Sequence, residues 1–211
     1  MAVITSLDEL RAGKVLQGEA ISMRAIEAPV TLRNTSDEVL YILDKDEGIY
    51  LPAGEELELN EKMTVISVSV EDSGPPLSGQ PRAAVLHVHL ADLPIQRTGD
   101  RRYRELIQRE ITQFVGSIPP GRAPDHFHLY EEMLCILHGS GVLWTGETKT
   151  PIGPGTCVYL PKREVHCMEN TGSGELRLLG VFYPAGSPAV RYEVQQRAGG
   201  GPEGGKLDRR D

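Results

Sequence analysis

The sequence predicts an all-β protein, and three observations carry this prediction. Glycine (23 residues) and proline (15 residues) recur along the 211 residues of the chain and separate short runs of valine, isoleucine, leucine and tyrosine. Short runs of this kind between turn residues are typical of strands joined by tight turns. The third observation is an internal repeat of such runs. The length is sufficient to bury a real core, as one large domain or two small ones.

The repeat relates residues 37–43 to residues 131–137. Both segments begin with two acidic residues and continue as an apolar run, and Tyr50-Leu51-Pro52 then matches Tyr159-Leu160-Pro161. The connection between the matched parts is shorter in the first copy, by the length of a hairpin. Such self-similarity indicates two related units. We therefore expect a shortened barrel or half-barrel over residues 1–71 and a complete barrel over residues 84–194.

Turn residues delimit the remaining elements. Residues 72–83 are rich in proline, glycine and serine and are expected to form a linker, whereas residues 195–211 contain almost no apolar residue and are expected to be disordered. Between these segments, turns at residues 139–141 and 146–147 predict a hairpin. The strands expected before it, within it and after it cover residues 84–90, 101–107, 111–118, 139–161, 176–186 and 190–196.

Charge and cysteine content exclude several classes of protein. A formal net charge of −8 argues against binding to a phosphate backbone or to an anionic membrane surface. The N-terminal residues lack the basic start and apolar core of a signal peptide, and no stretch approaches the roughly 18 apolar residues of a membrane span. We expect a soluble, cytoplasmic protein whose three cysteines stay reduced, with no nucleic-acid or membrane partner.

Three histidines and a carboxylate form the clearest chemical pattern. His126 and His128 are two residues apart and Glu132 follows four residues later, so on one strand all three side chains would share a face. His166 can complete the set from a strand folded alongside. Such a set of three nitrogens and one oxygen suits Fe, Mn, Co, Ni or Zn, and an octahedral ion held by it would keep two positions free. We expect one divalent transition metal ion.

His87 and His89 form a second pair with the same spacing. The position four residues beyond His89 is Leu93, so this strand provides no carboxylate in register. We expect His87 and His89 to be strand or surface histidines. The parity of Cys135 and Cys167 turns them away from the metal, whereas the orientation of Cys157 stays open.

These segments resemble the two motifs of the cupin family. The residues that match the two motifs are Gly121, His126, His128, Glu132 and Gly139 in the first, and Gly155, Pro161, His166 and Asn170 in the second. Two departures are visible. Gly121 lies one residue closer to the first histidine than in the family pattern, and Arg163, which we expect near the pocket mouth, replaces a glycine.

The resemblance covers residues 84–194 and implies a jelly-roll barrel, a double-stranded β-helix, with His126, His128, Glu132 and His166 as metal ligands. In the register of the repeat, the three histidines fall on Leu32, Asn34 and Leu57, while Glu38 keeps the acid. We therefore expect a bicupin whose first half is degenerate and metal-free.

The family resemblance implies a broad range of functions. Its members include dioxygenases, decarboxylases, isomerases, lyases and non-enzymatic binders, and fold alone does not choose among them. We expect a metal-dependent enzyme whose small, oxygen-bearing organic substrate chelates the metal, with a dioxygenase-type oxidoreductase as first candidate. The alternatives are an isomerase, a decarboxylase, a lyase or a non-catalytic binding module. The residues expected near the substrate are Gln113, Phe114, Tyr159, Arg177 and Phe182.

Exposed strand edges and sheet faces favour association. We expect a homodimer, or a pseudo-dimer of the two halves within one chain.

Overall fold

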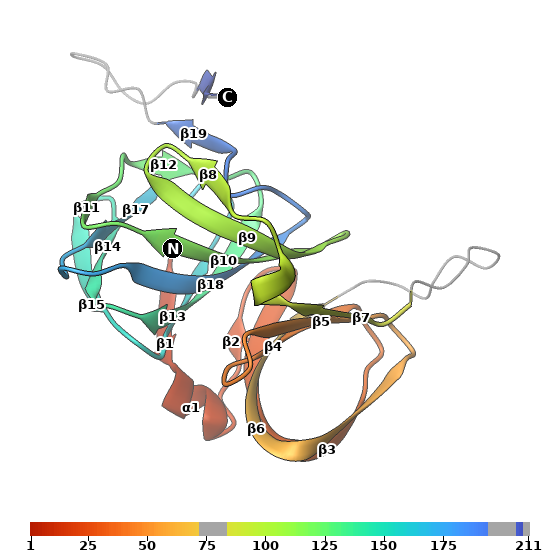
Figure 1. Cartoon of the computed structure of the whole chain (residues 1–211). Coiled ribbons are helices and arrows are strands. Elements are labelled where there is room, and N and C mark those ends of the chain that lie inside the picture. The colour runs from red at the N-terminus through yellow and green to blue at the C-terminus, as the bar shows by residue number, and fades with distance from the viewer. Residues whose placement is uncertain (72–83, 194–205, 209–211) are drawn as a thin grey trace, which may run out of the picture.

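The computed structural model describes residues 1–71, 84–193 and 206–208, which form three antiparallel sheets (Figure 1). The predicted linker 72–83 and all of the predicted tail except residues 206–208 lie outside the described residues. The only helical elements in this part of the chain are α1 (Leu7–Arg11) and a short 3-10 turn (Leu90–Asp92). The predicted all-β class is confirmed.

The first sheet has seven strands, and one of its faces lines the core of the predicted barrel. Its strands, in spatial order, are β1 (Val3–Ser6), β16 (Thr156–Leu160), β13 (Glu131–His138), β18 (Leu176–Tyr183), β10 (Thr112–Ile118), β9 (Arg101–Gln108) and β8 (Gln96–Thr98).

The second sheet faces the first. Its strands, in spatial order, are β15 (Thr148–Ile152), β14 (Gly141–Thr145), β17 (His166–Asn170), β12 (His126–Phe127), β19 (Arg191–Glu193) and β20 (Lys206–Asp208), and β11 (Gly121–Arg122) also pairs with β17. Leu134 and Leu178 of the first sheet pack with Leu143 and Met168 of the second in one buried cluster. Two antiparallel sheets enclosing such a core form a jelly roll.

The third sheet lies in the first part of the chain. Its strands, in spatial order, are β2 (Leu16–Gln17), β3 (Ile21–Arg33), β6 (Glu56–Val70), β4 (Glu38–Ile42), β5 (Glu47–Leu51) and β7 (Leu86–His89). The long strands β3 and β6 pair along their length and curve strongly (Figure 1). Leu40, Ile49 and Val65 belong to the apolar cluster on one face of this sheet.

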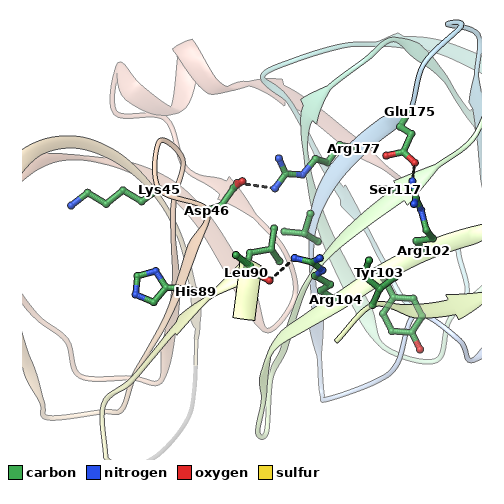
Figure 2. A pocket seen from close by; sticks show the side chains of 13 residues that line it. Lys45, Asp46, His89, Leu90, Arg102, Tyr103, Arg104, Ser117, Glu175 and Arg177 are labelled. Carbon is green, nitrogen blue, oxygen red and sulfur yellow. Dashed lines mark hydrogen bonds and ion pairs between the residues drawn. The ribbon is translucent and has the colours of Figure 1, made fainter. Parts of the chain in front are cut away.

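The other face of the third sheet packs against the outer face of the first. Tyr41, Ile66 and Val68 of the third sheet share one buried cluster with Met133 and Val181 of the first. Beside this contact lies a cavity of about 550 Å³, where Arg177 pairs with Asp46 at 2.8 Å (Figure 2). The first sheet is therefore covered on both faces.

Two strands cross the predicted division of the chain. β1 pairs with β16 in the first sheet, with Val3 opposite Tyr159. β7 pairs with β5 in the third sheet, although it follows the predicted linker. The division into residues 1–71 and 84–194 stays a prediction, but each part of the chain contributes a strand to the sheet of the other.

The predicted repeat has a counterpart in strand pairing. Leu32 pairs with Leu57 in the third sheet, and His126 pairs with His166 in the second. These are the residues that the repeat sets over one another. Glu38 is buried and forms an ion pair with Arg24 at 2.9 Å, so an arginine accompanies the acid where no imidazole is present.

Replacing Ile66 by alanine should destabilise both halves together. The side chain is fully buried between the first and third sheets, and such truncations cost about 2–5 kcal/mol. Urea unfolding followed by circular dichroism reports all sheets, whereas fluorescence of the single tryptophan, Trp144, reports the second sheet. Both midpoints should fall equally.

The matched control is Ile95→Ala, because Ile95 is 51% exposed and its loss should change the free energy of unfolding by no more than about 0.5 kcal/mol. A shift in the circular dichroism midpoint without one in Trp144 fluorescence would contradict the joint unfolding of the sheets.

Candidate metal centre

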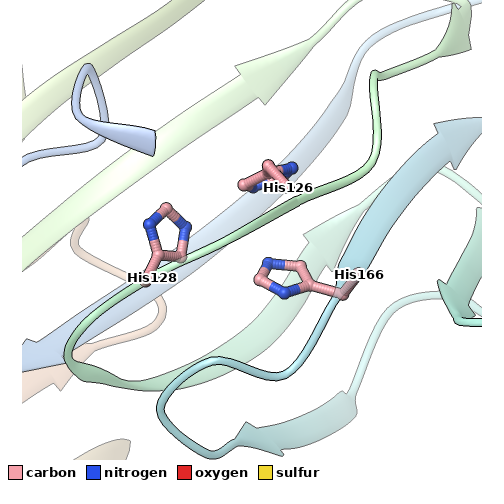
Figure 3. Close-up of side chains that lie close together, drawn as sticks. All are labelled: His126, His128 and His166. Atoms are coloured by element: carbon pink, nitrogen blue, oxygen red, sulfur yellow. The ribbon is translucent and has the colours of Figure 1, made fainter. Parts of the chain in front are cut away.

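The three predicted histidine ligands converge on one point. His126, His128 and His166 are all buried, and each has a ring nitrogen within 4.8 Å of a ring nitrogen on the other two (Figure 3). Cross-strand pairing of His126 with His166 places two of the rings side by side, with ring centroids 4.5 Å apart. The folding of β17 alongside β12 thus produces the juxtaposition that the sequence predicts.

Glu132 reaches this group from the opposite sheet. Its Oε2 lies 3.3 Å from Nε2 of His166 and 3.7 Å from Nε2 of His128. The sequence pattern predicts both imidazoles and the carboxylate on one strand, and this detail is wrong. β12 ends at Phe127 and β13 begins at Glu131, so a bend at residues 129–130 carries the chain from the second sheet to the first. The carboxylate therefore meets the histidines across the core.

Backbone carbonyls fix the orientation of two of the rings. Nδ1 of His126 lies 3.0 Å from the carbonyl of Pro124, and Nδ1 of His166 lies 2.9 Å from the carbonyl of Glu164. A carbonyl accepts a hydrogen bond only from a protonated nitrogen, so a neutral ring held this way carries its lone pair on Nε2. Outer hydrogen bonds of this kind are typical of metal-binding histidines.

Burial and mutual charge set the protonation of the group. Burial and the neighbouring imidazoles of His166 and His128 hold the pKa of His126 well below its usual range. Burial alone would raise the pKa of Glu132, but the hydrogen bond with His166 and the charge of His128 outweigh it, so the pKa is lowered. Burial opposes charge on His166 as well, yet Glu132 raises the pKa of that ring. The centre therefore offers a carboxylate and at least one neutral imidazole.

A backbone hydrogen bond connects the turn at Arg163, in the second motif, to the first motif. The backbone N–H of Arg163 donates to the carbonyl of His128 at 2.8 Å. Arg163 has φ of 66°, a left-handed conformation that glycine adopts more readily, and it occupies the place where the family pattern has glycine. Asn170 of the same motif donates to the carbonyls of Ile118 and Gly174, so its role here is to hold the following turn.

A cavity of about 80 Å³ opens beside the four side chains. Phe114 and Phe182, two of the residues expected near the substrate, line it and pack with ring centroids 4.8 Å apart. Arg101 and Tyr103 from β9 also line it and were not among the expected residues. Alternation along the predicted strand 101–107 puts both on one face, but nothing in the sequence shows that this face turns toward the histidines.

The structure does not bring the other three expected residues to this cavity. Gln113 donates to the carbonyl of Leu40 at 3.2 Å, Tyr159 donates to Glu131 at 3.1 Å, and Arg177 pairs with Asp46. Each lies on the outer face of the first sheet, among residues that pack against the third sheet or its connections. Strand alternation explains this, since their neighbours Phe114, Leu178 and Leu160 take the inner face.

The three cysteines lie outside the group of donors. Cys135 and Cys157 are buried on the outer face of the first sheet, with their sulfur atoms 3.3 Å apart. Cys167 is buried beside Arg122 and does not line the cavity. The orientation of Cys157, open from the sequence, is thus away from the candidate centre. Among the described residues there is also no helix with the length and apolar character needed to cross a membrane.

Known proteins resemble this chain in sequence and in fold. Residues 114–182 match the family model of the cupin domain. A stretch of 84 residues is 30% identical to auxin-binding protein 1 of Arabidopsis thaliana, covering 35% of this chain and 42% of that protein. The match therefore spans less than half of the length of that relative.

Solved structures extend the likeness to most of the chain. A variant of oxalate decarboxylase from Bacillus subtilis superposes with a TM-score of 0.61 at 13% identity, covering 88% of this chain and 73% of the other. Another structure of that enzyme concerns its Mn(II) centres. AerE from Microcystis aeruginosa gives a TM-score of 0.62 at 14% identity over 80% of this chain and 90% of its own. Identities this low show the fold alone. The chain thus has the cupin fold, and its residues 114–182 match the cupin domain model.

Proposed function

We propose that this protein is a metal-dependent cupin enzyme that acts on a small, carboxylated and oxygen-bearing substrate. The observation that carries the proposal is the convergence of three buried imidazoles and a buried carboxylate beside a small cavity. His126, His128, Glu132 and His166 would hold one divalent transition ion. Packing alone does not explain four polar side chains buried at one point, because burying such groups costs free energy.

The donor set fits such an ion. Oε2 of Glu132 is buried, with Nε2 of His166 at 3.3 Å and Nε2 of His128 at 3.7 Å, and a buried carboxylate is costly unless its charge is compensated, as a bound cation would do. Imidazole nitrogens with a carboxylate oxygen suit Fe, Mn, Co, Ni or Zn. When bound, the ion supplies a Lewis acid that polarises substrate oxygens, or a site for activating dioxygen. Glu132 serves in this proposal as a ligand and not as a general base.

The cavity restricts the size of the substrate. Its volume of about 80 Å³ is well below the roughly 300–1,000 Å³ of pockets for drug-sized ligands. A compound with only a few non-hydrogen atoms would fill it. The rings of Phe114 and Phe182 form an apolar wall that excludes water around such a compound.

The charge of the cavity favours an anion. Arg101 lines it, and its positive charge acts on both His126 and Glu132 in the direction of a lower pKa, after the larger effects of burial and the neighbouring histidines. A guanidinium binds a carboxylate through paired hydrogen bonds. We therefore assign Arg101 the role of orienting a substrate carboxylate.

A dioxygenase-type oxidation is the first candidate among the reactions that this donor set supports. A decarboxylation, isomerisation or lyase reaction would use the same donors, and the likeness in fold to oxalate decarboxylase favours the decarboxylation. The test is a screen of small hydroxy-, keto- and enol-acids with protein loaded with each of the five metals. Oxygen uptake identifies the oxidation, whereas carbon dioxide release without oxygen uptake identifies the decarboxylation.

A binding module without turnover is the second candidate function. The partial sequence match to auxin-binding protein 1 favours it, because that protein is named for binding. Metal-dependent binding of a small acid, measured by calorimetry, with no turnover of any compound in the screen would support this candidate over the enzyme.

We also propose that the first half of the chain is a degenerate cupin copy. The pairing of Leu32 with Leu57, in the positions that correspond to His126 and His166, supports this. The cover that the third sheet gives to the outer face of the first supports the pseudo-dimer over the homodimer, since that face is buried within one chain.

Changing His126 and His128 together to alanine should remove one bound metal ion per chain and leave the fold intact. Two of the four donors are lost, while the apolar residues around them remain. Metal content by mass spectrometry and circular dichroism measure the two effects. An unchanged metal content relative to the wild type would refute the ligand assignment.

Glu132→Gln should weaken metal retention by at least about 10–100-fold, because even a residue that only supports a ligand contributes that much. Turnover of any substrate found in the screen should fall with it. Competition with a chelator gives the affinity.

The matched control is Glu131→Gln. Glu131 is equally buried but accepts hydrogen bonds from the backbone N–H groups of Glu19 and Ala20 on the outer face. This change should lower stability and leave metal retention unchanged. Equal loss of metal in both variants would show that Glu132 has no special role.

Arg101→Gln should raise KM for a carboxylated substrate by about 10–100-fold, since a hydrogen bond to a charged group contributes about 1.5–3 kcal/mol. Metal content should not change. Arg97→Gln is the control, because Arg97 is exposed on the neighbouring strand and does not line the cavity. An unchanged KM for Arg101→Gln would exclude the assigned role.

A further inference from the structure

We propose that Glu47, His87 and His89 form a second metal site, which takes a borderline divalent transition ion such as Zn²⁺, Co²⁺ or Ni²⁺. This site lies on the third sheet and shares no residue with the candidate centre at His126. It does not rest on the function proposed above. It revises the expectation that the first half of the fold is metal-free.

The carboxylate of Glu47 touches both imidazoles. Oε2 lies 2.8 Å from Nε2 of His87, and Oε1 lies 3.1 Å from Nδ1 of His89. One ligand atom from each of the three residues lies within 4.8 Å of the other two, the same limit that the histidines of the candidate centre meet. The two rings stack with centroids 5.2 Å apart. The carboxylate oxygens already lie close to both imidazoles, so a single ion could bind all three side chains.

The strand pairing holds these residues in place. On β7, Leu86 and Val88 pack against the core between the first and third sheets, so His87 and His89 share the opposite face. Glu47 stands directly across from His89 on β5. The carboxylate that the β7 strand itself lacks, with Leu93 at the expected offset, is thus supplied by its neighbour.

Exposure leaves room to complete a metal shell. The side chains of His87 and His89 are 50% and 55% exposed, whereas that of Glu47 is 11% exposed. β7 is the last strand in the order of the third sheet among the described residues, so water can approach the rings from the open side. Two imidazoles with one carboxylate and water suit zinc and its neighbours, whereas calcium and magnesium prefer oxygen ligands alone.

The surroundings distinguish this site from a simple surface ion pair. His89 also lies at the edge of the 550 Å³ cavity between the sheets, which Arg104 and Arg177 line (Figure 2). The nearby cations are engaged elsewhere, since Arg177 pairs with Asp46 and Lys45 pairs with Glu61 at 2.6 Å. Among the described residues, neither forms an ion pair with the carboxylate of Glu47.

The test measures zinc binding by the full chain. Protein freed of metal with a chelator is dialysed against Zn²⁺ alone, and bound zinc is counted by mass spectrometry. The wild type should bind two ions, the double variant His87→Gln with His89→Gln one, and the double variant His126→Ala with His128→Ala one. Glu47→Gln should weaken the second binding event by at least about 10–100-fold, for the reason given for Glu132.

The matched control is His138→Gln, because His138 is an exposed strand histidine outside both groups and its variant should bind two ions. Equal zinc content in the wild type and in the His87, His89 variant would overturn the proposal. If instead only the His126, His128 variant matched the wild type, the candidate centre would fail and the second site would stand.

A second measurement avoids dependence on the variants. Titration of the wild type with Co²⁺ should broaden the ring resonances of His87 and His89 in nuclear magnetic resonance spectra, and leave that of His138 sharp. Sharp resonances of His87 and His89 at saturating Co²⁺ would equally overturn the proposal.

Discussion

The register of β13 is the constraint on which the rest of the structure depends. Its neighbouring residues Glu131 and Glu132 are both buried, yet they face opposite sides of the first sheet. Glu132 meets the histidines, while Glu131 accepts hydrogen bonds from the backbone of residues 19 and 20 and from Tyr159. A slip of one residue would exchange the two carboxylates. One strand alignment therefore fixes both the candidate centre and the contact between the two parts of the chain.

Turn residues, short apolar runs and the internal repeat predicted the fold class, and motif spacing predicted that the four donors would meet, because histidines at fixed intervals on adjoining strands have few other geometries. It could not show from which sheet each donor comes. The bend at residues 129–130 contains no glycine or proline that would reveal it, and its position depends on how the two sheets close around the core. The spacing of four residues between His128 and Glu132 predicted that their side chains would meet, and they do, but along a different local path of the chain.

The lining of the cavity was less predictable. Gln113 and Phe114 are adjacent, so only one of them can face the donors, and apolar neighbours on both faces of the first sheet hide which one does. The same holds for Tyr159 and Arg177. Partners across strands are equally invisible along the sequence, since Glu47 and His87 are 40 residues apart. On the strand of His87 and His89, the position where a carboxylate would be expected holds Leu93, so the sequence alone did not indicate a site there.

The exchange of β1 and β7 between the sheets bears on the order in which the protein can fold. β1, at Val3, completes its sheet only against β16, at Tyr159, and β7 completes the third sheet from beyond residue 83. Pairings so distant along the chain require loop closure before any contact compensates for the lost entropy. The first sheet cannot complete its edge at β1 until β16, which ends at Leu160, is available, whereas the third sheet needs the chain only as far as His89. Folding should therefore be slow and highly cooperative. Until β16 has been synthesised, unpaired strand edges are exposed and can associate wrongly.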